Sequence, residues 1–164
     1  MQSKILFFVF ILFAFFISSE CVAQKKNKDK RFEIGAIVKV GNFEYKVNSY
    51  NFEKSIGNDF YSKTADGVYL IINLTIKNVS KESRTLDGSM FYLYDSRGTK
   101  FEYSTEGATA LELVTDKTMF LKDFHPNIPT EGQIVFEVPS ADDHYLLQVT
   151  GGFWSGKQAN IQIK

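Results

Sequence analysis

The segment 68–76 constrains the fold of this chain most, because its hydrophobic side chains alternate with a period of two. In a β-strand, side chains two positions apart lie on the same face, so the pattern predicts one long strand with a buried face. Burying each aliphatic side chain contributes about 1.5–3 kcal/mol. We therefore place this strand at the centre of the core, with five aliphatic residues pointing inward: Val68, Leu70, Ile72, Leu74 and Ile76.

The same alternation recurs in shorter segments that are separated by turn residues. Segments 36–40 and 43–47 flank the turn Gly41-Asn42, which predicts a hairpin. A second hairpin is predicted around residues 95–98, and further strands at 134–138, 145–149 and 159–163. Since no helical period lies between them, we predict an all-β, immunoglobulin-like antiparallel β-sandwich of about seven to nine strands over residues 32–164.

Two long stretches, 51–67 and 104–129, do not alternate. Long connections in compact domains tend to carry function or local structure, and we expect a short helical turn at 111–114. Aromatic side chains in polar surroundings are enriched where proteins bind, so recognition is predicted to lie on these stretches. The alternative is that the rings fold back over the open ends of the sandwich. The candidate binding residues are Phe60, Tyr61, Phe120, Phe124 and His125.

The first residues have the three-part pattern of an export signal. A short basic start precedes the apolar run 5–17, which is too short to span a bilayer as a helix. Cys21-Val22-Ala23 then places small side chains at a signal peptidase site. We predict that residues 1–23 are a cleaved signal peptide, that Gln24 begins the mature chain, and that no stable transmembrane segment remains.

Cys21 offers an alternative, in which this residue is acylated and anchors the protein to a membrane. Glu20 argues against it, because a lipoprotein signal carries a small uncharged residue before the cysteine. Cleavage after Ala23 leaves no cysteine, so the exported domain is stabilised without disulfides. We therefore expect a periplasmic or extracellular protein. Residues 24–31 are mostly basic with nothing apolar to bury, which predicts a flexible tether.

Charge and motif content exclude several classes of function. The chain has 19 basic and 19 acidic residues, so it lacks the net attraction that nucleic-acid binding requires. Neither His125 nor His144 accompanies a nucleophile motif, and we expect no catalytic residue and no cofactor. The segment Asp142-Asp143-His144 has two interpretations. It is either an ordinary polar turn or part of a calcium site.

Four segments carry a resemblance to a known family: 35–41, 67–78, 91–98 and 135–139. They resemble the bacterial exported immunoglobulin-like (telokin-like) domains of unknown function related to a secreted immunoprotective mycobacterial antigen. The resemblance implies export or lipid anchoring and the sandwich fold, and it adds no catalytic residue. One departure lies at 126–132, where many members have a Pro-Gly turn.

Together these observations predict an exported, non-catalytic binding or interaction module whose partner is an unknown protein or envelope component. Two alternatives stay open. One is an envelope lipoprotein with a structural role, and the other is a metal-dependent enzyme.

Overall fold

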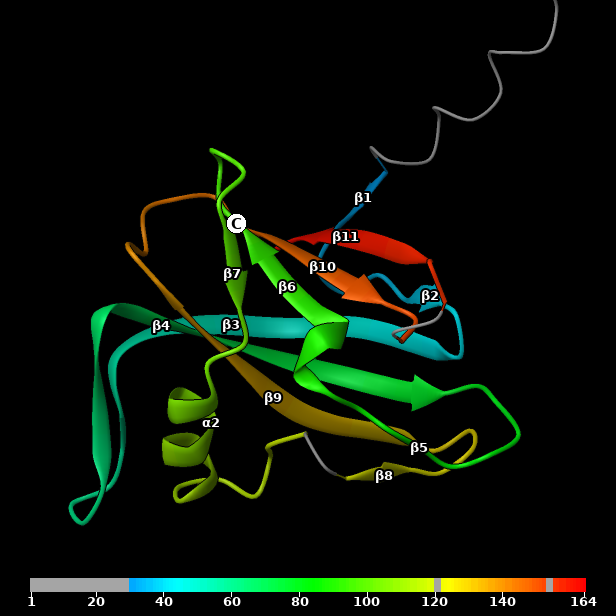
Figure 1. The fold of residues 1–164 in the computed structure, drawn as a ribbon, viewed down its shortest axis with the longest axis horizontal. Coiled ribbons are helices and arrows are strands. Elements are labelled where there is room, and N and C mark those ends of the chain that lie inside the picture. The colour runs from blue at the N-terminus through cyan, green and yellow to red at the C-terminus, as the bar shows by residue number, and fades with distance from the viewer. Residues whose placement is uncertain (1–29, 120–121, 153–154) are drawn as a thin grey trace, which may run out of the picture. The chain divides into compact units, whose positions relative to one another are not determined.

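The computed structural model (Figure 1) describes residues 30–119, 122–152 and 155–164. Sheet A has five strands in the order β1-β11-β10-β6-β7, and sheet B has four in the order β2-β3-β4-β9. A third sheet pairs β5 with β8. The predicted signal peptide, its cleavage site at Ala23 and Gln24, and the tether up to residue 29 lie outside the described residues.

The elements of the described chain are, in order, β1 Arg31–Phe32, β2 Val38–Val40, β3 Phe43–Gly57, β4 Ser62–Asn78, β5 Arg84–Thr85, η1 Gly88–Met90, β6 Phe91–Tyr94, β7 Lys100–Glu102, α2 Thr105–Glu112, β8 Asp123–Phe124, β9 Pro129–Val138, β10 Leu146–Thr150 and β11 Gln158–Gln162. The predicted all-β sandwich is confirmed. The strand count exceeds the expected seven to nine because β1, β5 and β8 have two residues each, too few to show alternation.

The central strand of sheet B follows the predicted alternation. Leu70, Ile72, Leu74 and Ile76 are each 0% exposed on β4, which pairs with β3 on one side and β9 on the other. These residues belong to the sandwich core, the buried cluster to which both sheets contribute. Both predicted hairpins form, as β2–β3 and β6–β7.

Tyr45 links the two sheets across the sandwich core. Its ring meets Phe91 of sheet A edge to face, with centroids 5.8 Å apart, and its hydroxyl donates to the Thr150 carbonyl at 2.8 Å. Burial raises the pKa of this hydroxyl far above its ordinary value, and the Asp87 carboxylate adds to the shift. The phenol therefore stays neutral and keeps its hydrogen bond.

The stretch 51–67 was expected to be irregular, and this prediction is wrong. It forms the far half of the β3–β4 hairpin, with the tip at 58–61. The alternation is hidden by irregular pairing, because Lys54 alone stands opposite the four residues 65–68 of β4. The Lys54 ammonium donates to the carbonyls of Ala65, Asp66 and Gly67 at 2.7, 3.0 and 2.9 Å. We call the hairpin beyond this point, residues 55–64, the arm (Figure 1).

The stretch 104–129 contains a helix that begins earlier than the turn expected at 111–114. α2 starts after Ser104, whose hydroxyl caps it by accepting the Gly107 N–H at 3.1 Å. The helix covers part of the face of sheet B that points away from sheet A. A second buried cluster lies between them, the outer cluster: Ile56, Ala65, Tyr69, Ile71, Ala110, Leu111 and Val135.

Gly107 allows the close approach of α2 to sheet B. A Cβ at this position would lie 2.8 Å from Val135 Cγ1 and 3.0 Å from Tyr69 Cε1. Any side chain here would push the helix away from the strands. The glycine thus fixes how α2 lies over the outer cluster.

Candidate functional site

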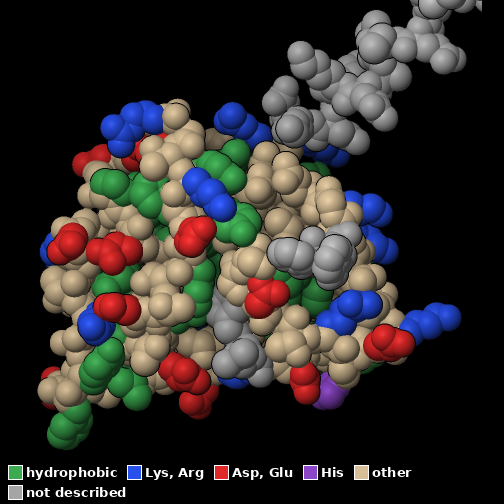
Figure 2. Space-filling model, viewed as in Figure 1, with side chains coloured by type: hydrophobic (Ala, Val, Ile, Leu, Met, Phe, Trp, Pro, Cys, Tyr) green, Lys and Arg blue, Asp and Glu red, His purple; other side chains and the backbone are tan. Residues whose placement is uncertain are grey.

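The end of the arm carries an apolar surface that nothing in the described chain covers. Phe60 is 98% exposed and Tyr61 37%, and beside them Leu113 and Val114 at the end of α2 are 53% and 45% exposed. We call these four residues the tip patch. They are four of the seven large hydrophobic side chains that are exposed in the described part of the chain. Figure 2 shows hydrophobic side chains gathered at the lower left, where the arm ends.

Asn58 shapes the tip through its side chain. Its side-chain Oδ1 accepts the backbone N–H groups of Phe60 and Tyr61, both at 3.0 Å, and its backbone N–H donates to the Tyr61 carbonyl at 2.8 Å. Gly57 enters the turn with a φ of 132°, and a Cβ there would lie 2.2 Å from the Tyr61 carbonyl oxygen. The aromatic pair is therefore presented on a defined turn.

Contacts with α2 hold the arm in place. The Asn58 amide lies 3.5 Å from the Leu113 carbonyl, and Ile56 of β3 packs in the outer cluster with Leu111 of the helix. An ion pair joins Lys63 of β4 to Glu106 in the first turn of α2, with 3.1 Å between Nζ and Oε2. These contacts bring the two halves of the tip patch together from segments far apart in the sequence.

One ion pair, between Lys63 and Glu106, borders the tip patch. The hydrogen bond and the negative charge of Glu106 raise the pKa of Lys63 above its ordinary value. The Lys63 ammonium also lies 5.9 Å from the centroid of the Tyr61 ring. The amphipathic surroundings of the patch suit a contact in which an apolar centre is excluded from water and a polar rim stays wet.

The structure separates the candidate binding residues into two groups. Phe60 and Tyr61 lie in the tip patch, whereas Phe124 lies in β8, at the other end of β3, where its ring meets Phe43 edge to face at 6.5 Å. Phe124 is 1% exposed, which corrects its assignment to a binding loop. His125 is exposed, and its Nδ1 lies 2.9 Å from the Ser83 hydroxyl. Phe120 lies outside the described residues.

Sequence reasoning missed Leu113 and Val114 as site residues. Both directly follow the last residue of α2, where an apolar pair precedes Thr115 and Asp116. Apolar residues at the end of a helix ordinarily turn inward. Here the helix ends at the arm, where the Leu113 carbonyl meets the Asn58 amide, and both side chains are exposed.

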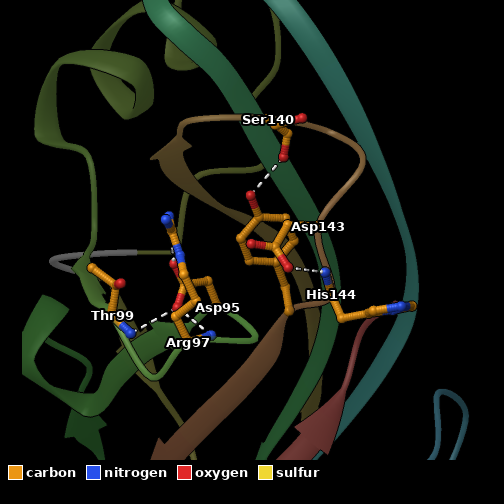
Figure 3. A network of polar contacts seen from close by, with 7 residues as sticks. Asp95, Arg97, Thr99, Ser140, Asp143 and His144 are labelled. Atoms are coloured by element: carbon orange, nitrogen blue, oxygen red, sulfur yellow. Dashed lines mark hydrogen bonds and ion pairs between the residues drawn. The ribbon is translucent and has the colours of Figure 1, made fainter.

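The possible metal ligands Asp142, Asp143 and His144 do not converge. Figure 3 shows the His144 ring directed away from the Asp143 carboxylate, which instead accepts the His144 backbone N–H at 2.7 Å. Hydrogen bonding from Ser96, followed by that of His144, lowers the Asp143 pKa. Across the residues that the structure describes, no group of three or more acidic, histidine or cysteine side chains is placed to hold a metal.

Asp95 is likewise committed to a turn. Its carboxylate accepts the backbone N–H groups of Arg97 and Thr99 at 3.0 and 2.7 Å (Figure 3). Burial works to raise the pKa of Asp95, but the hydrogen bonds from Thr99 and Arg97 outweigh it and lower the pKa. The carboxylate thus stabilises the β6–β7 hairpin.

No helix in the described ranges has the length and apolar character needed to cross a membrane. No curated protein matches the chain in sequence.

Several solved structures share the fold at low sequence identity. A Bacillus subtilis protein, ycdA, provisionally classed as a lipoprotein, matches with a TM-score of 0.57 and 19% identity over 77% of this chain and 38% of its own. This chain therefore spans well under half of that protein. A β-sandwich protein from Clostridium difficile matches with a TM-score of 0.53 and 18% identity over 85% of this chain and 99% of its own.

The secreted protein MPT63 from Mycobacterium tuberculosis matches with a TM-score of 0.54 and 11% identity, over 83% of this chain and 98% of its own. At these identities the likeness concerns the fold alone. A family model described as a domain of unknown function (DUF4352) matches residues 32–161. The predicted resemblance is thereby confirmed, and the chain belongs to the DUF4352 family.

Proposed function

We propose that this domain is an exported, non-catalytic binding module of the cell envelope or extracellular space. Its tip patch contacts the partner, a protein or an envelope component. The single observation that carries the proposal is the side chain of Phe60, which is 98% exposed on a turn held by four hydrogen bonds of Asn58. Similarity in fold to a secreted protein supports export.

Physical chemistry favours recognition at this place. Burial of a side chain of this size contributes about 1.5–3 kcal/mol, and this free energy is not gained while the ring stays in water. The hydrogen bonds of Asn58 and the packing of Ile56 against α2 hold the backbone that carries the ring, so little backbone entropy remains to be lost on binding. A solvated aromatic residue on a defined turn is thus suited to be the anchor of an interface.

A lipid-anchored form is the second candidate, supported by the similar structure classed provisionally as a lipoprotein. It differs from the first candidate only in that a lipid on Cys21 holds the protein at the membrane. The intact mass of the N-terminal peptide from the envelope of the native host distinguishes them. Cleavage after Ala23 gives a peptide that begins with Gln24, whereas a lipoprotein gives a peptide that begins with acylated Cys21.

Substitution of Phe60 tests the binding function. Tagged wild-type protein and the Phe60→Ser variant are used to capture partners from the envelope and culture medium of the native host. A matched control, Ile34→Ser, removes an exposed hydrophobic residue that is 36% exposed and lies outside the tip patch. We expect Phe60→Ser to lose a captured component that Ile34→Ser retains, with the melting temperature unchanged in Phe60→Ser. Equal capture by all three proteins contradicts the proposal.

A further inference from the structure

A groove opens on the outer face of sheet B, at the end of the sheet away from the arm. Its volume is about 120 Å³. Its lining includes Ile37, Thr75 and Pro129. Ile37 is 69% exposed, and Ile128, which precedes Pro129, is 55% exposed. α2 packs farther along the same face, over Tyr69 and Ile71, so it leaves this end of the sheet uncovered.

The size and lining of the groove fit one aromatic ring. A protein cavity of roughly 150 Å³ accommodates benzene, and a half-open groove of about 120 Å³ can receive a phenyl group whose edge stays in solvent. Lys46 and Lys77 add their aliphatic stems to the lining, which also includes Glu44 and Tyr45. Lysine stems cover apolar surface while their ammonium groups remain in water.

The charges at the groove favour a carboxylate beside that ring. Lys46 and Lys77 provide two ammonium groups, and Glu44 provides one carboxylate, which leaves one positive charge in excess. Neither lysine forms an ion pair among the residues that the structure describes. An aromatic side chain with an adjacent acidic residue is therefore the complementary ligand.

The arm of this same chain presents that ligand. Phe60 is 98% exposed, and the exposed Asp59 precedes it on the tip turn. We propose that Phe60 and Asp59 of one copy dock into the groove of a second copy. This inference rests on the proposed function, because it names the partner that the tip patch contacts.

The positions of arm and groove favour a closed dimer. The arm is tied to α2 through Asn58 and Leu113, so the tip lies on the side of sheet B that α2 covers, and the groove opens on that side at the opposite end of β3 and β4. Two copies can face each other with this side of sheet B, their strands running in opposite directions. The tip of each copy then lies at the groove of the other. Such a contact is isologous and stops at two copies.

Sedimentation equilibrium of the purified protein over a range of concentrations tests the dimer. We expect a reversible monomer–dimer equilibrium, weakened about tenfold or more by Phe60→Ser and by the double variant Lys46→Glu/Lys77→Glu. Lys157→Glu, an exposed lysine in the connection between β10 and β11, is the matched control and leaves the equilibrium unchanged. A monomer at every concentration, or groove variants that associate like the wild type, overturns the inference.

Two further experiments identify the contact itself. Adding Asp59→Lys to the double variant restores the opposite charges, and we expect it to recover the association that Lys46→Glu/Lys77→Glu loses. Mixing Phe60→Ser with the double variant leaves one intact tip and one intact groove, and we expect the mixture to form heterodimers more strongly than either variant self-associates. Failure of both results overturns the docking of the tip in the groove.

The two proposals fail in distinguishable ways. If the wild type captures a different component through Phe60 and does not self-associate, the dimer is wrong and the binding function stands. If Phe60→Ser changes neither capture nor self-association, both are wrong.

Discussion

The sandwich core and the outer cluster lie on opposite faces of sheet B, and the sequence encodes them differently. Ile72 and Ile71 are neighbours on β4, but Ile72 points into the sandwich core and Ile71 into the outer cluster, at 0% and 5% exposed. The first face is buried by another sheet, so its residues alternate regularly. The second face is buried by α2 along only part of its length. In the sequence it is therefore visible only as a few apolar residues, such as Ile71, at positions that are otherwise polar.

The two regions also differ in extent. Among the described residues, the sandwich core contains 23 buried residues, most of them from the two sheets, whereas the outer cluster contains seven. Most of the apolar area removed from water thus lies between the sheets, and the stability of the domain depends mainly on that region. The outer cluster positions α2 and the arm, and through them the tip patch.

The largest expected effect comes from placing a charge in each region. Ile72→Asp should prevent folding, because an isolated carboxylate between the sheets has no partner. Ile71→Asp should leave the sandwich folded with α2 detached, because the helix can move away and admit water. Far-ultraviolet circular dichroism, thermal melting and hydrogen exchange of the 105–112 amides distinguish these states. If Ile71→Asp also abolishes folding, the outer cluster is an integral part of the core and the distinction fails.

A smaller effect is expected from Gly107→Val, which affects only the outer cluster. The added side chain overlaps Val135 and Tyr69, and overpacking of this kind costs about 1–3 kcal/mol. Chemical denaturation measures the loss in free energy of unfolding. Thr109→Val is the control for valine in this helix, because at this exposed position it replaces a hydroxyl by a methyl group, leaves the bulk nearly unchanged and removes only the hydrogen bond to the Thr105 carbonyl. Equal losses in the two variants would show that α2 does not rest closely on β4 and β9.

Acid should destabilise the sandwich end that contains Asp95 and Asp143. Their pKa values are lowered in the fold, so their stabilising contribution is present above the unfolded value of about 3.9 and is lost as pH falls through the lower folded values. Asp143→Asn should flatten the fall of the melting temperature below about pH 4. An unchanged slope in this variant would show that the hydrogen bonds from Ser96 and His144 do not favour the ionised form.

The smallest effect is expected from Thr75→Asp. Thr75 lies on the uncovered part of the outer face and pairs with Lys46 on one side and Glu131 on the other, so the new carboxylate stays hydrated between one charge of each sign. The free energy of unfolding should change by no more than about 0.5 kcal/mol. Damage comparable to that of Ile72→Asp would mean that this part of sheet B is buried as well.

The sequence predicts those parts of the fold in which burial repeats locally. Residues 68–76 show the sandwich face of β4 because each inward position is aliphatic. The hairpins were visible because Gly41 and Gly98 take positive φ angles of 59° and 83° in their turns. The arm was missed because Lys54 interrupts the pairing, and α2 because its cap, Ser104, precedes a helix of only eight residues.

The candidate site was partly predictable. Phe60 and Tyr61 were selected as aromatic residues in a polar stretch, and both lie in the tip patch. Phe124 fits the same description but is buried against Phe43, since a ring in a two-residue strand gives no local sign of its direction. The approach of Leu113 to the tip depends on contacts between the arm and α2, and no local pattern specifies contacts over such a separation.

The three hydrogen bonds of Lys54 have a consequence for how this scaffold can be altered. Because one ammonium group replaces the strand pairing of residues 65–68, the arm has a register of its own, from Ser55 and Thr64 to Gly57 and Ser62. Adding or deleting matched pairs beyond this point lengthens or shortens the arm by about 3.4 Å per pair and leaves the alternation of the sandwich untouched. The part of the arm beyond Ile56 and Lys63, which contact α2, is therefore modular: its length and tip can be exchanged while the sandwich core stays the same.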